Sequence, residues 1–409
     1  MNATAKAECN VADLWNLDPS FVFLNHGSYG AVPKKILEEQ YRLHLHIETQ
    51  PVRFFAREVE DLLERSRNRL SEFINADPQG VVFVPNATTG VNTVLKSITF
   101  SPGDEVVITD HIYNACKNAL ELVARRDGLK INVVRVPFPI GSKEDVKQLV
   151  LEQVTPSTKL VLLDHITSPT ALIFPVEDIV RTLNEMGVDV LVDGAHAPGM
   201  VPLNLKELNP TYYTGNCHKW LCAPKGSAFL YIREDRRRLV RPLVTSHGAN
   251  STRKDKTFLH LEFDWTGTGD YTPYILIPSC LEFLEGIFPG GIRELMDRNR
   301  HLALWARRLL CERFDIPLPC PDDMVGSMAA VPILPPETEP LQTSVKSFDR
   351  IQELLFRQYR IEVPVISWPS CEKRLVRISA QVYNKERDYL TLAEALREIL
   401  GHGSGGCGS

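Results

Sequence analysis

The chain has 409 residues, of which 44% are hydrophobic and 24% are charged. This composition is that of a globular protein, and it excludes a disordered chain, a collagen-like repeat and a coiled coil. The 46 Lys and Arg residues against 51 Asp and Glu residues give a net charge of -5. Such a chain has no basic field to hold a nucleic acid or an anionic membrane. No apolar run reaches the roughly 20 residues that a membrane span needs, and the length favours two domains.

The N-terminal residues MNATAKAECN lack the basic start and apolar core of a signal peptide, so we expect a cytoplasmic protein. The chain has nine cysteines, an odd number, and no CxxC pair. A disulfide framework would be even and denser, and a zinc site would show paired short spacings. We therefore expect no metal site, and most of the cysteines should be buried or incidental thiols.

Between residues 80 and 235, short apolar runs alternate with stretches of helical spacing. Strands are predicted at 81–84, 105–109, 131–136, 159–164, 188–193, 212–215 and 227–232. Helices are predicted at 88–98, around 117–126 and at 176–186. The runs at 159–164 and 188–193 are almost wholly apolar, as in strands that are buried on both faces. The pattern predicts an α/β domain with a mostly parallel sheet covered by helices on both sides.

After Pro273 the pattern changes to that of a smaller α+β domain. Helices are predicted at 275–287, 292–314, 345–359 and 385–400, and strands at 328–334, 361–366 and 375–379. The Pro-rich stretch 335–340 should be a surface loop. The predicted organisation is an N-terminal arm at 1–20, a large α/β domain at 21–289, a small α+β domain at 290–400 and a disordered Gly/Ser tail at 401–409.

A first candidate site is an anion cradle at the start of the predicted helix 88–98. The sequence lacks both GxGxxG after a strand and GxxxxGK[ST], so the common nucleotide signatures are missing. Instead, Pro-Asn-Ala-Thr-Thr-Gly at 85–90 follows a strand and opens a helix. Free backbone N–H groups with the hydroxyls of Thr88 and Thr89 form a good anion site. The alternative is that Asn86 or Thr88 only caps the helix.

A second candidate is Asp193, which ends an apolar strand within VDGAHAPG. A carboxylate at this end of a buried strand faces the crevice in which open α/β sheets bind ligands. A buried carboxylate also needs a cationic partner. The alternative is that Asp193 is a capping residue and His196 a core histidine whose hydrogen bonds are satisfied.

A third candidate is Lys219, which lies beside Trp220 in NCHKW after the predicted strand 212–215. In an apolar and aromatic setting, loss of hydration lowers the pKa of a lysine, because it disfavours the ammonium form. Such lysines form Schiff bases with carbonyl compounds. The alternative, a surface lysine beside a core tryptophan, is the commoner arrangement in proteins.

Taken together, the three candidates match the needs of pyridoxal 5'-phosphate (PLP). A lysine holds the aldehyde, a carboxylate keeps the pyridine nitrogen protonated, and an anion cradle binds the phosphate. The residues alone therefore indicate a PLP enzyme.

The motifs resemble those of class V, fold-type I PLP-dependent enzymes, in the isopenicillin N epimerase-like branch that is related to hercynylcysteine sulfoxide lyases and cysteine desulfurases. The segments that carry the resemblance, in chain order, are LNHGSYG (24–30), PNATTGVN (85–92), TDHIYNA (109–115), HITSPTALIFP (165–175), VDGAHAPGMVPLNL (192–205), GNCHKWLCAPKG (215–226), GTGDYTPYILIP (267–278) and LVRISAQVYN (375–384). The resemblance implies a large PLP-binding domain with a seven-stranded type of sheet, a smaller C-terminal domain and a homodimer with shared active sites.

The resemblance also implies roles for single residues. Lys219 would be the catalytic Schiff-base lysine, Asp193 would pair with the pyridinium nitrogen, and His196 would lie near the ring hydroxyl. Tyr113, or Asn114 beside it, would stack on the ring. The phosphate would be bound by four residues of the same chain and one of the neighbouring subunit: Thr88, Thr89, Asn216, His218 and the neighbour's Thr268. The amino-acid substrate would be bordered by three residues: Asn25, Ser168 and Arg377, of which Arg377 would hold the α-carboxylate.

Three departures or additions bear on specificity. Relatives often have Gly after SPT, where this chain has Ala171. Desulfurases carry a mobile cysteine some thirty residues before the carboxylate arginine, but the stretch around Lys346 has none and Cys371 lies six residues before Arg377, so persulfide-forming activity is not expected. Arg53 and Phe54 could select the substrate side chain; the alternative is that Phe54 packs in the core and Arg53 is solvated.

The resemblance favours an epimerase-like reaction at the α-carbon of an amino acid. The alternatives are a C–S β-lyase that acts on a cysteine derivative or sulfoxide, a class V aminotransferase, and a PLP-binding scaffold without catalysis. The presence of Lys219, Asp193 and Arg377 together argues against a scaffold, which does not need all three.

Overall fold

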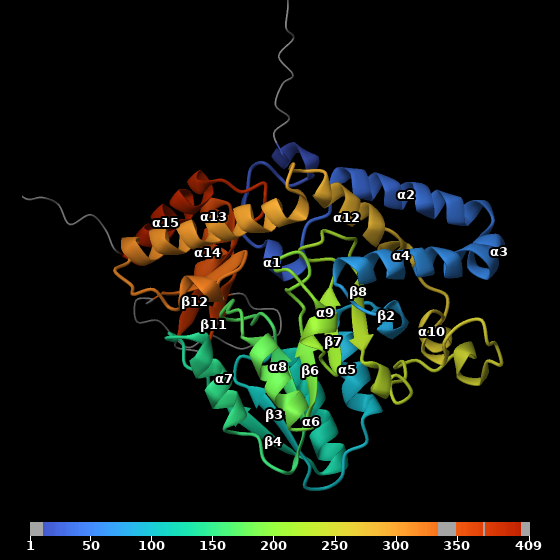
Figure 1. The fold of residues 1–409 in the computed structure, drawn as a ribbon. Coiled ribbons are helices and arrows are strands. Elements are labelled where there is room, and N and C mark those ends of the chain that lie inside the picture. The colour runs from blue at the N-terminus through green and yellow to red at the C-terminus, as the bar shows by residue number, and fades with distance from the viewer. Residues whose placement is uncertain (1–10, 334–348, 371–372, 402–409) are drawn as a thin grey trace, which may run out of the picture.

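The computed structural model describes residues 11–333, 349–370 and 373–401. Its centre is a seven-stranded sheet in the order β2-β8-β7-β6-β5-β3-β4 (Figure 1). The strands are β2 (Val81–Val84), β3 (Glu105–Thr109), β4 (Lys130–Val134), β5 (Thr158–Asp164), β6 (Asp189–Asp193), β7 (Tyr212–Asn216) and β8 (Ala228–Ile232). Both antiparallel pairings in this sheet involve β8, which lies between β2 and β7, and the other pairings are parallel. The predicted mostly parallel sheet is therefore confirmed, with each strand within two residues of its expected bounds.

The sheet is buried on both faces because alternate residues of each strand point into two separate cores. In β5, Leu160 and Leu162 belong to one core, whereas Val161 and Leu163 belong to the other. The first core is closed by α5 (Ala87–Ser97) and α6 (Asn114–Asp127). Helices on the opposite face include α7 (Lys143–Leu151) and α8 (Val176–Glu185). This two-sided burial is the physical reason for the continuous apolar runs in the sequence.

The smaller C-terminal unit contains a three-stranded antiparallel sheet in the order β11-β12-β9. Its strands are β9 (Met328–Ile333), β11 (Val365–Ser367) and β12 (Arg374–Ser379), and its helices are α13 (Gly291–Arg313), α14 (Arg350–Tyr359) and α15 (Glu386–Ile399). Near the N-terminus, β1 (Val22–Phe23) pairs in parallel with β10 (Ile361–Glu362). This pairing ties the start of the chain to the C-terminal unit. The predicted domain boundaries themselves stay a prediction.

In the C-terminal half, one strand and one helix that the sequence predicts as continuous are each divided in two, so both predictions are wrong in this respect. The strand 361–366 is divided into β10 and β11 around Val363 and Pro364, whose ring nitrogen cannot donate a ladder hydrogen bond. The helix 275–287 is divided into α11 (Thr272–Ile275) and α12 (Ile277–Glu285). Pro278 cannot donate to the carbonyl of Tyr274, and the hydroxyl of Ser66 donates to that oxygen instead.

The helices before residue 80 were not predicted from the sequence. They are α1 (His26–Tyr29), α2 (Lys34–Thr49), α3 (Pro51–Arg53) and α4 (Val59–Phe73), with α9 (Leu205–Leu208) and α10 (Phe258–Phe263) as further short helices later in the chain. Figure 1 shows α2 and α4 reaching away from the C-terminal unit, with α3 at the far tip. Along α2 only Ile36 and Ile47 are buried, so its apolar pattern is weak.

Several predicted features lie outside the described residues. These are residues 1–10 of the arm, the loop 335–340, the start of the helix 345–359, Lys346, Cys371 and the tail beyond 401. Within the arm, Trp15 is buried and packs edge-on against Phe283 and Tyr383. None of the helices in the described ranges has the length and apolar content to span a membrane.

The contact between α5 and β7 depends on a glycine. A Cβ at Gly90 would lie 2.3 Å from the hydroxyl of Thr214 and 2.8 Å from its Cβ. We expect Gly90→Ala to destabilise the protein by about 1–3 kcal/mol, because overpacking forces the helix away from the sheet. Chemical denaturation measures this, and Gly286→Ala is the control, since a Cβ there has ordinary contacts of 3.4 Å or more. Equal stability of the two variants would contradict the close-contact argument.

Candidate active site

A cavity of about 810 Å³ lies at the carboxyl ends of β5, β6 and β7, beside the first turn of α5 and next to β12. All but two of the site residues expected from the sequence line it: Thr88, Thr89, Tyr113, Ser168, Asp193, His196, Asn216, His218, Lys219 and Arg377. The two exceptions are Asn25 and Thr268. The fold thus brings together residues that are almost 290 positions apart in the sequence.

Lys219 is placed in the cavity by the turn that follows β7. Its Nζ lies 3.0 Å from Nε2 of His196. Removal from bulk water, together with the positive charge of Arg377, lowers the pKa of Lys219 to about 7. Burial, with the charges of Lys219 and Arg377, also lowers the pKa of His196 well below its usual value. Near neutral pH the cavity therefore holds an amine with a substantial unprotonated fraction, which is the form that attacks carbonyl carbons.

Asp193 is the last residue of β6, and its side chain is 5% exposed. Its Oδ1 accepts a hydrogen bond of 3.0 Å from the backbone N–H of Ala195, and its Oδ2 accepts one of 3.3 Å from the thiol of Cys116. Burial raises the pKa of Asp193, and the nearby Lys219 opposes that rise. The carboxyl is thus prepared to ionise once a cationic group lies against it.

The anion cradle at the start of α5 has fewer free backbone N–H groups than the sequence predicts. Asn86 is the N-cap and accepts from the backbone N–H of Thr89 at 2.8 Å, while the side-chain oxygen of Asn216 accepts from Ala87 N–H at 2.8 Å. In the described part of the chain, this leaves Thr88 as the first-turn residue whose N–H has no partner. The cradle therefore offers one backbone N–H with side-chain groups, rather than a row of free N–H groups.

His218 closes the same end of the cavity. Its Nδ1 lies 2.8 Å from the carbonyl oxygen of Ser227, so Nδ1 carries the proton, and Nε2 has no hydrogen-bond partner among the described residues. Burial and the charge of Lys219 lower the pKa of His218 to about 4. A bound dianion would reverse this effect, because the opposite charge favours the doubly protonated ring, which then donates from Nε2.

Arg377 lines the same cavity from the middle of β12. Its side chain is 4% exposed, and Nη1 donates to the carbonyl oxygen of Ser168 at 2.6 Å. Nη2 donates to the hydroxyl of Ser28 at 3.0 Å, and that hydroxyl donates to Oδ1 of Asn25 at 2.5 Å. Asn25 therefore lies one layer behind the cavity, where it orients Ser28 and, through it, Arg377.

Tyr113, and not Asn114, lines the cavity. The phenol side chain is 46% exposed, and burial of the rest raises its pKa. Asn114 is instead the first residue of α6, for which Tyr113 is the N-cap. The sequence left open whether Tyr113 or Asn114 would stack on a cofactor ring, and of these two residues only Tyr113 lines the cavity.

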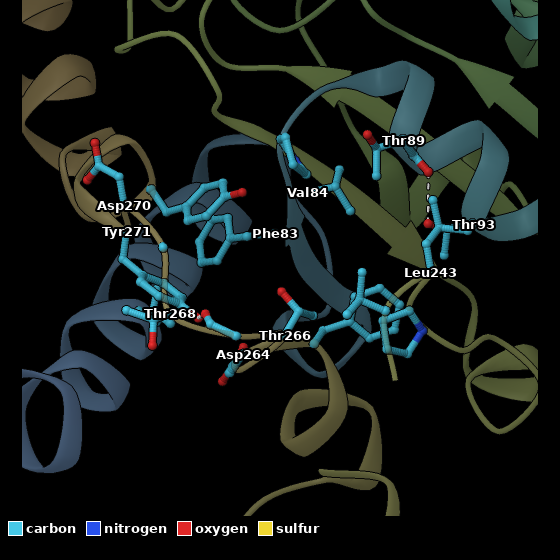
Figure 2. A pocket seen from close by; sticks show the side chains of 18 residues that line it. Phe83, Val84, Thr89, Thr93, Leu243, Asp264, Thr266, Thr268, Asp270 and Tyr271 are labelled. Atoms are coloured by element: carbon cyan, nitrogen blue, oxygen red, sulfur yellow. Dashed lines mark hydrogen bonds between the residues drawn. The ribbon is translucent and has the colours of Figure 1, made fainter. Parts of the chain in front are cut away.

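Thr268 lies in a second cavity of about 410 Å³ in its own chain (Figure 2). Figure 2 shows Thr268 with Thr266 and Asp264 on one side of this cavity and Phe83 and Tyr271 near by. Thr89 borders both cavities. Within one chain, Thr268 therefore does not line the large cavity, although the cavity that it lines shares Thr89 with the anion cradle.

The structure resolves two further expectations from the sequence. Phe54 is buried in the core, and Arg53 is exposed and forms an ion pair of 2.8 Å with Glu58, so the packing alternative describes this chain. Neither residue lines the large cavity. Ala171 is buried with a φ of +57°, a left-handed conformation that glycine adopts without a Cβ penalty. This explains why glycine suits the position.

Sequence reasoning missed several residues that line the cavity: Ser28, Tyr29, Asp164, Lys225 and Gly226. It also treated Cys116 as an incidental thiol, although the thiol donates to Asp193. For Asp164 a signal was available, because the residue ends an apolar strand in the same way as Asp193. The described cysteines, which are Cys116, Cys217, Cys222, Cys280, Cys311 and Cys320, are all buried and free.

The chain is similar in sequence to one known family of proteins. The family model described as "Aminotransferase class-V" matches residues 24–316. Isopenicillin N epimerase from Amycolatopsis lactamdurans is 32% identical, with 97% of this chain and 99% of the relative covered. A probable chloroplastic L-cysteine desulfhydrase from Arabidopsis thaliana is also 32% identical, with 94% and 84% covered. Hercynylcysteine sulfoxide lyase from Schizosaccharomyces pombe is 22% identical, with 94% and 95% covered.

Solved structures share the fold at lower identity. The cystine C–S lyase C-DES in complex with cysteine persulfide has a TM-score of 0.75 at 20% identity, covering 93% of this chain and 98% of that chain. The cysteine desulfurase CsdA from Escherichia coli has a TM-score of 0.76 at 19% identity, covering 95% and 97%. These likenesses establish the fold-type I architecture.

Proposed function

The chain belongs to the aminotransferase class-V family and is a PLP-dependent enzyme, and from this premise we propose that it breaks the C–S bond of a cysteine derivative by β-elimination. The observation that carries the proposal is the buried amine of Lys219, whose Nζ lies 3.0 Å from His196 and whose pKa is lowered to about 7. Such an amine can take the α-proton and return it to the leaving sulfur, and elimination needs no second proton carrier. The 32% identity to a probable L-cysteine desulfhydrase over 94% of this chain supports the same reaction.

The residues present fit PLP. When bound, PLP supplies an aldehyde joined to a pyridinium ring that accepts electrons from the α-carbon. We assign Lys219 to the aldehyde, Asp193 to the ring nitrogen and Thr88 with His218 to the phosphate. Two buried polar atoms without a hydrogen-bond partner in the described residues, Nδ1 of His196 and Nε of Arg377, support a ligand in this cavity.

The reaction then follows from the arrangement of the side chains. Arg377 holds the α-carboxylate of the substrate, which fixes the Cα–H bond relative to Lys219. Nζ of Lys219 takes the α-proton, the Cβ–S bond breaks, and its electron pair leaves on sulfur. Lys219 can return the proton to that sulfur. With L-cysteine and water, the products are sulfide, pyruvate and ammonia, and both atoms and charge balance.

The proposal is tested with L-cysteine, S-alkylcysteines and cysteine sulfoxides as substrates of the purified holoenzyme. We expect pyruvate and the sulfur product in a 1:1 ratio with at least one of them. A keto acid that keeps its sulfur would indicate an aminotransferase instead. If all the substrates stay unchanged while the cofactor is bound, the elimination proposal is wrong and epimerisation of another amino acid becomes the better interpretation.

Epimerisation is the second candidate, and it is favoured by one observation. Tyr113 lines the cavity with a phenol that keeps its proton and could deliver it to the face of the α-carbon away from Lys219. The 32% identity to an isopenicillin N epimerase over 97% of this chain supports the same reaction. Tyr113→Phe separates the two candidates, since it should stop an epimerase but leave elimination within about tenfold of wild type.

The lowered pKa of Lys219 predicts how cofactor uptake depends on pH. Only the neutral amine attacks the aldehyde, so the rate of bond formation in the empty protein should rise through pH 7 and level off above it. Stopped-flow absorbance between pH 5.5 and 10 measures this rate. Arg377→Gln should move the midpoint upward, because the positive charge of Arg377 is the second cause of the lowered pKa. A wild-type rate that still rises at pH 10 would contradict the argument.

We further propose a homodimer in which Thr268 of one subunit completes the phosphate site of the other. Tyr29 and Tyr113 line the large cavity while 75% and 46% exposed, and Leu243 and Val244, which line the second cavity, are 42% and 55% exposed. Large exposed apolar side chains gathered around two cavities are typical of an interaction surface. The cytoplasmic location expected from the sequence stays a prediction.

Mixing two inactive variants tests the shared site. Lys219→Ala and Thr268→Arg should each be inactive as pure dimers, whereas a mixed dimer contains one intact site and recovers up to about half of the activity of a wild-type dimer. The mixed dimer is isolated with two affinity tags and assayed for pyruvate. A monomeric wild type in sedimentation, or mixed dimers without activity, would contradict shared sites.

A further inference from the structure

Two acidic residues end neighbouring strands at the floor of the cavity. Asp164 of β5 and Asp193 of β6 are register partners in a parallel pair. Adjacent strands lie about 4.8 Å apart, and in-register residues of parallel strands point to the same face. Both side chains line the cavity, and they are only 4% and 5% exposed. Two buried carboxyl groups are therefore close neighbours.

Each carboxyl group has hydrogen-bond donors but no directly bound cation among the described residues. Asp193 accepts from Ala195 N–H and from the thiol of Cys116. At Asp164, its own backbone N–H and that of Tyr113 oppose the rise in pKa that burial causes. Two buried carboxylates in contact cannot both be ionised without such a cation, because burial and mutual repulsion act in the same direction.

We propose that Asp164 is a positioning residue that holds a proton beside Asp193, so that Asp193 alone carries the negative charge presented to the ring nitrogen of the cofactor. The proton would stay on Asp164 because Asp193, and not Asp164, is the residue assigned to the cationic ring nitrogen. The proposal rests on the cofactor assignment and not on the type of reaction.

The surroundings of the pair support a neutral Asp164. Burial, and then the charge of Asp193, raise the pKa of Asp164 well above its usual value. Because the pair holds a proton in the native state that the unfolded chain has lost above about pH 4, the contribution of the pair to stability should fall as the pH rises toward that raised pKa. The titratable or charged groups that face the pair are Cys116, Tyr113, Lys219, His196 and Arg377.

Infrared difference spectroscopy of the holoenzyme at pH 7 tests the proposal. Wild type should show the C=O stretch of a protonated, buried carboxylic acid, with the isotope shift expected in deuterated water. Asp164→Asn keeps the shape and an acceptor for Tyr113 N–H but cannot hold the acid proton, so this band should be lost. Asp189→Asn is the matched control, because this acid lies at the other end of β6 and is paired with Arg236 at 3.0 Å; the band should remain.

A second measurement covers the case in which Asp164→Asn loses the cofactor. As the pH rises from 5 to 8, the melting temperature of the empty wild-type protein should fall relative to those of Asp164→Asn and Asp193→Asn, because each variant removes one acid of the proton-holding pair. The lowered pKa values of Lys219, His196 and His218 act in the opposite direction, but they do so in all three proteins. A band that survives in Asp164→Asn holoenzyme, or melting curves whose pH dependence equals that of wild type, would overturn the proposal. Failure of the elimination assay alone would leave both results unchanged, so the two ideas are distinguishable.

Discussion

Lys219→Ala is expected to abolish turnover, with a loss of about 10⁴-fold or more, because it removes the group that holds the cofactor and the base that takes the α-proton. The visible absorbance of the cofactor–lysine bond should vanish at the same time. The protein should stay folded, since Nζ of Lys219 contacts only His196 in the described structure. Absorbance spectra and the pyruvate assay measure the two losses.

Lys225→Ala is the matched control for this experiment. Lys225 is a second lysine that lines the same cavity, six residues after Lys219. If Lys219 holds the cofactor, the Lys225 variant should keep the visible absorbance. Loss of the absorbance in Lys225→Ala with its retention in Lys219→Ala would reverse the assignment. Activity that survives Lys219→Ala would contradict the proposed role of the residue.

Arg377→Ala is expected to raise the KM for the amino acid by roughly 10- to 150-fold, because a charge-assisted hydrogen-bond pair contributes about 1.5–3 kcal/mol. Cofactor absorbance should change little, since Arg377 contacts Ser168 and Ser28 rather than the phosphate end. Removing the positive charge should also raise the pKa of Lys219 and move the activity profile to higher pH.

Arg377→Lys separates charge from geometry. A lysine keeps the positive charge but cannot form the planar, two-bond contact with a carboxylate. The variant should therefore keep the pH profile of wild type while it loses a large part of the substrate affinity. Arg377 would not be the carboxylate-binding residue if Arg377→Ala lost the cofactor before it lost affinity for the substrate.

The central sheet was predictable because its strands are buried on both faces, and the runs at β5 and β6 show this directly. The N-terminal helices were not predictable in the same way. Helix α2 buries only Ile36 and Ile47, so its sequence lacks a continuous apolar stripe. The divided elements β10–β11 and α11–α12 show that a proline interrupts a pattern that hydrophobicity alone would extend.

The core of the candidate site was predictable because each of its parts follows a strand with a distinctive ending. Asp164 has the same signal as Asp193, but a sequence does not reveal which strands are neighbours, and only the register of β5 with β6 brings the two acids together. The loss of free N–H groups at α5 was equally hidden, because Asn216 reaches Ala87 from 129 positions away. Long-range contacts of this kind leave no local pattern.

Proton NMR of the holoenzyme with L-cysteine and its derivatives in deuterated water tests the central claim most directly. We expect the substrate signals to disappear as deuterated pyruvate appears, with no build-up of the D-amino acid and no reaction in Lys219→Ala. Deuterium at Cα of recovered amino acid, with the opposite enantiomer accumulating and no pyruvate, would contradict elimination and establish epimerisation. Absence of both pyruvate and exchange at Cα, with the cofactor bound, would contradict the proposed removal of the α-proton by Lys219.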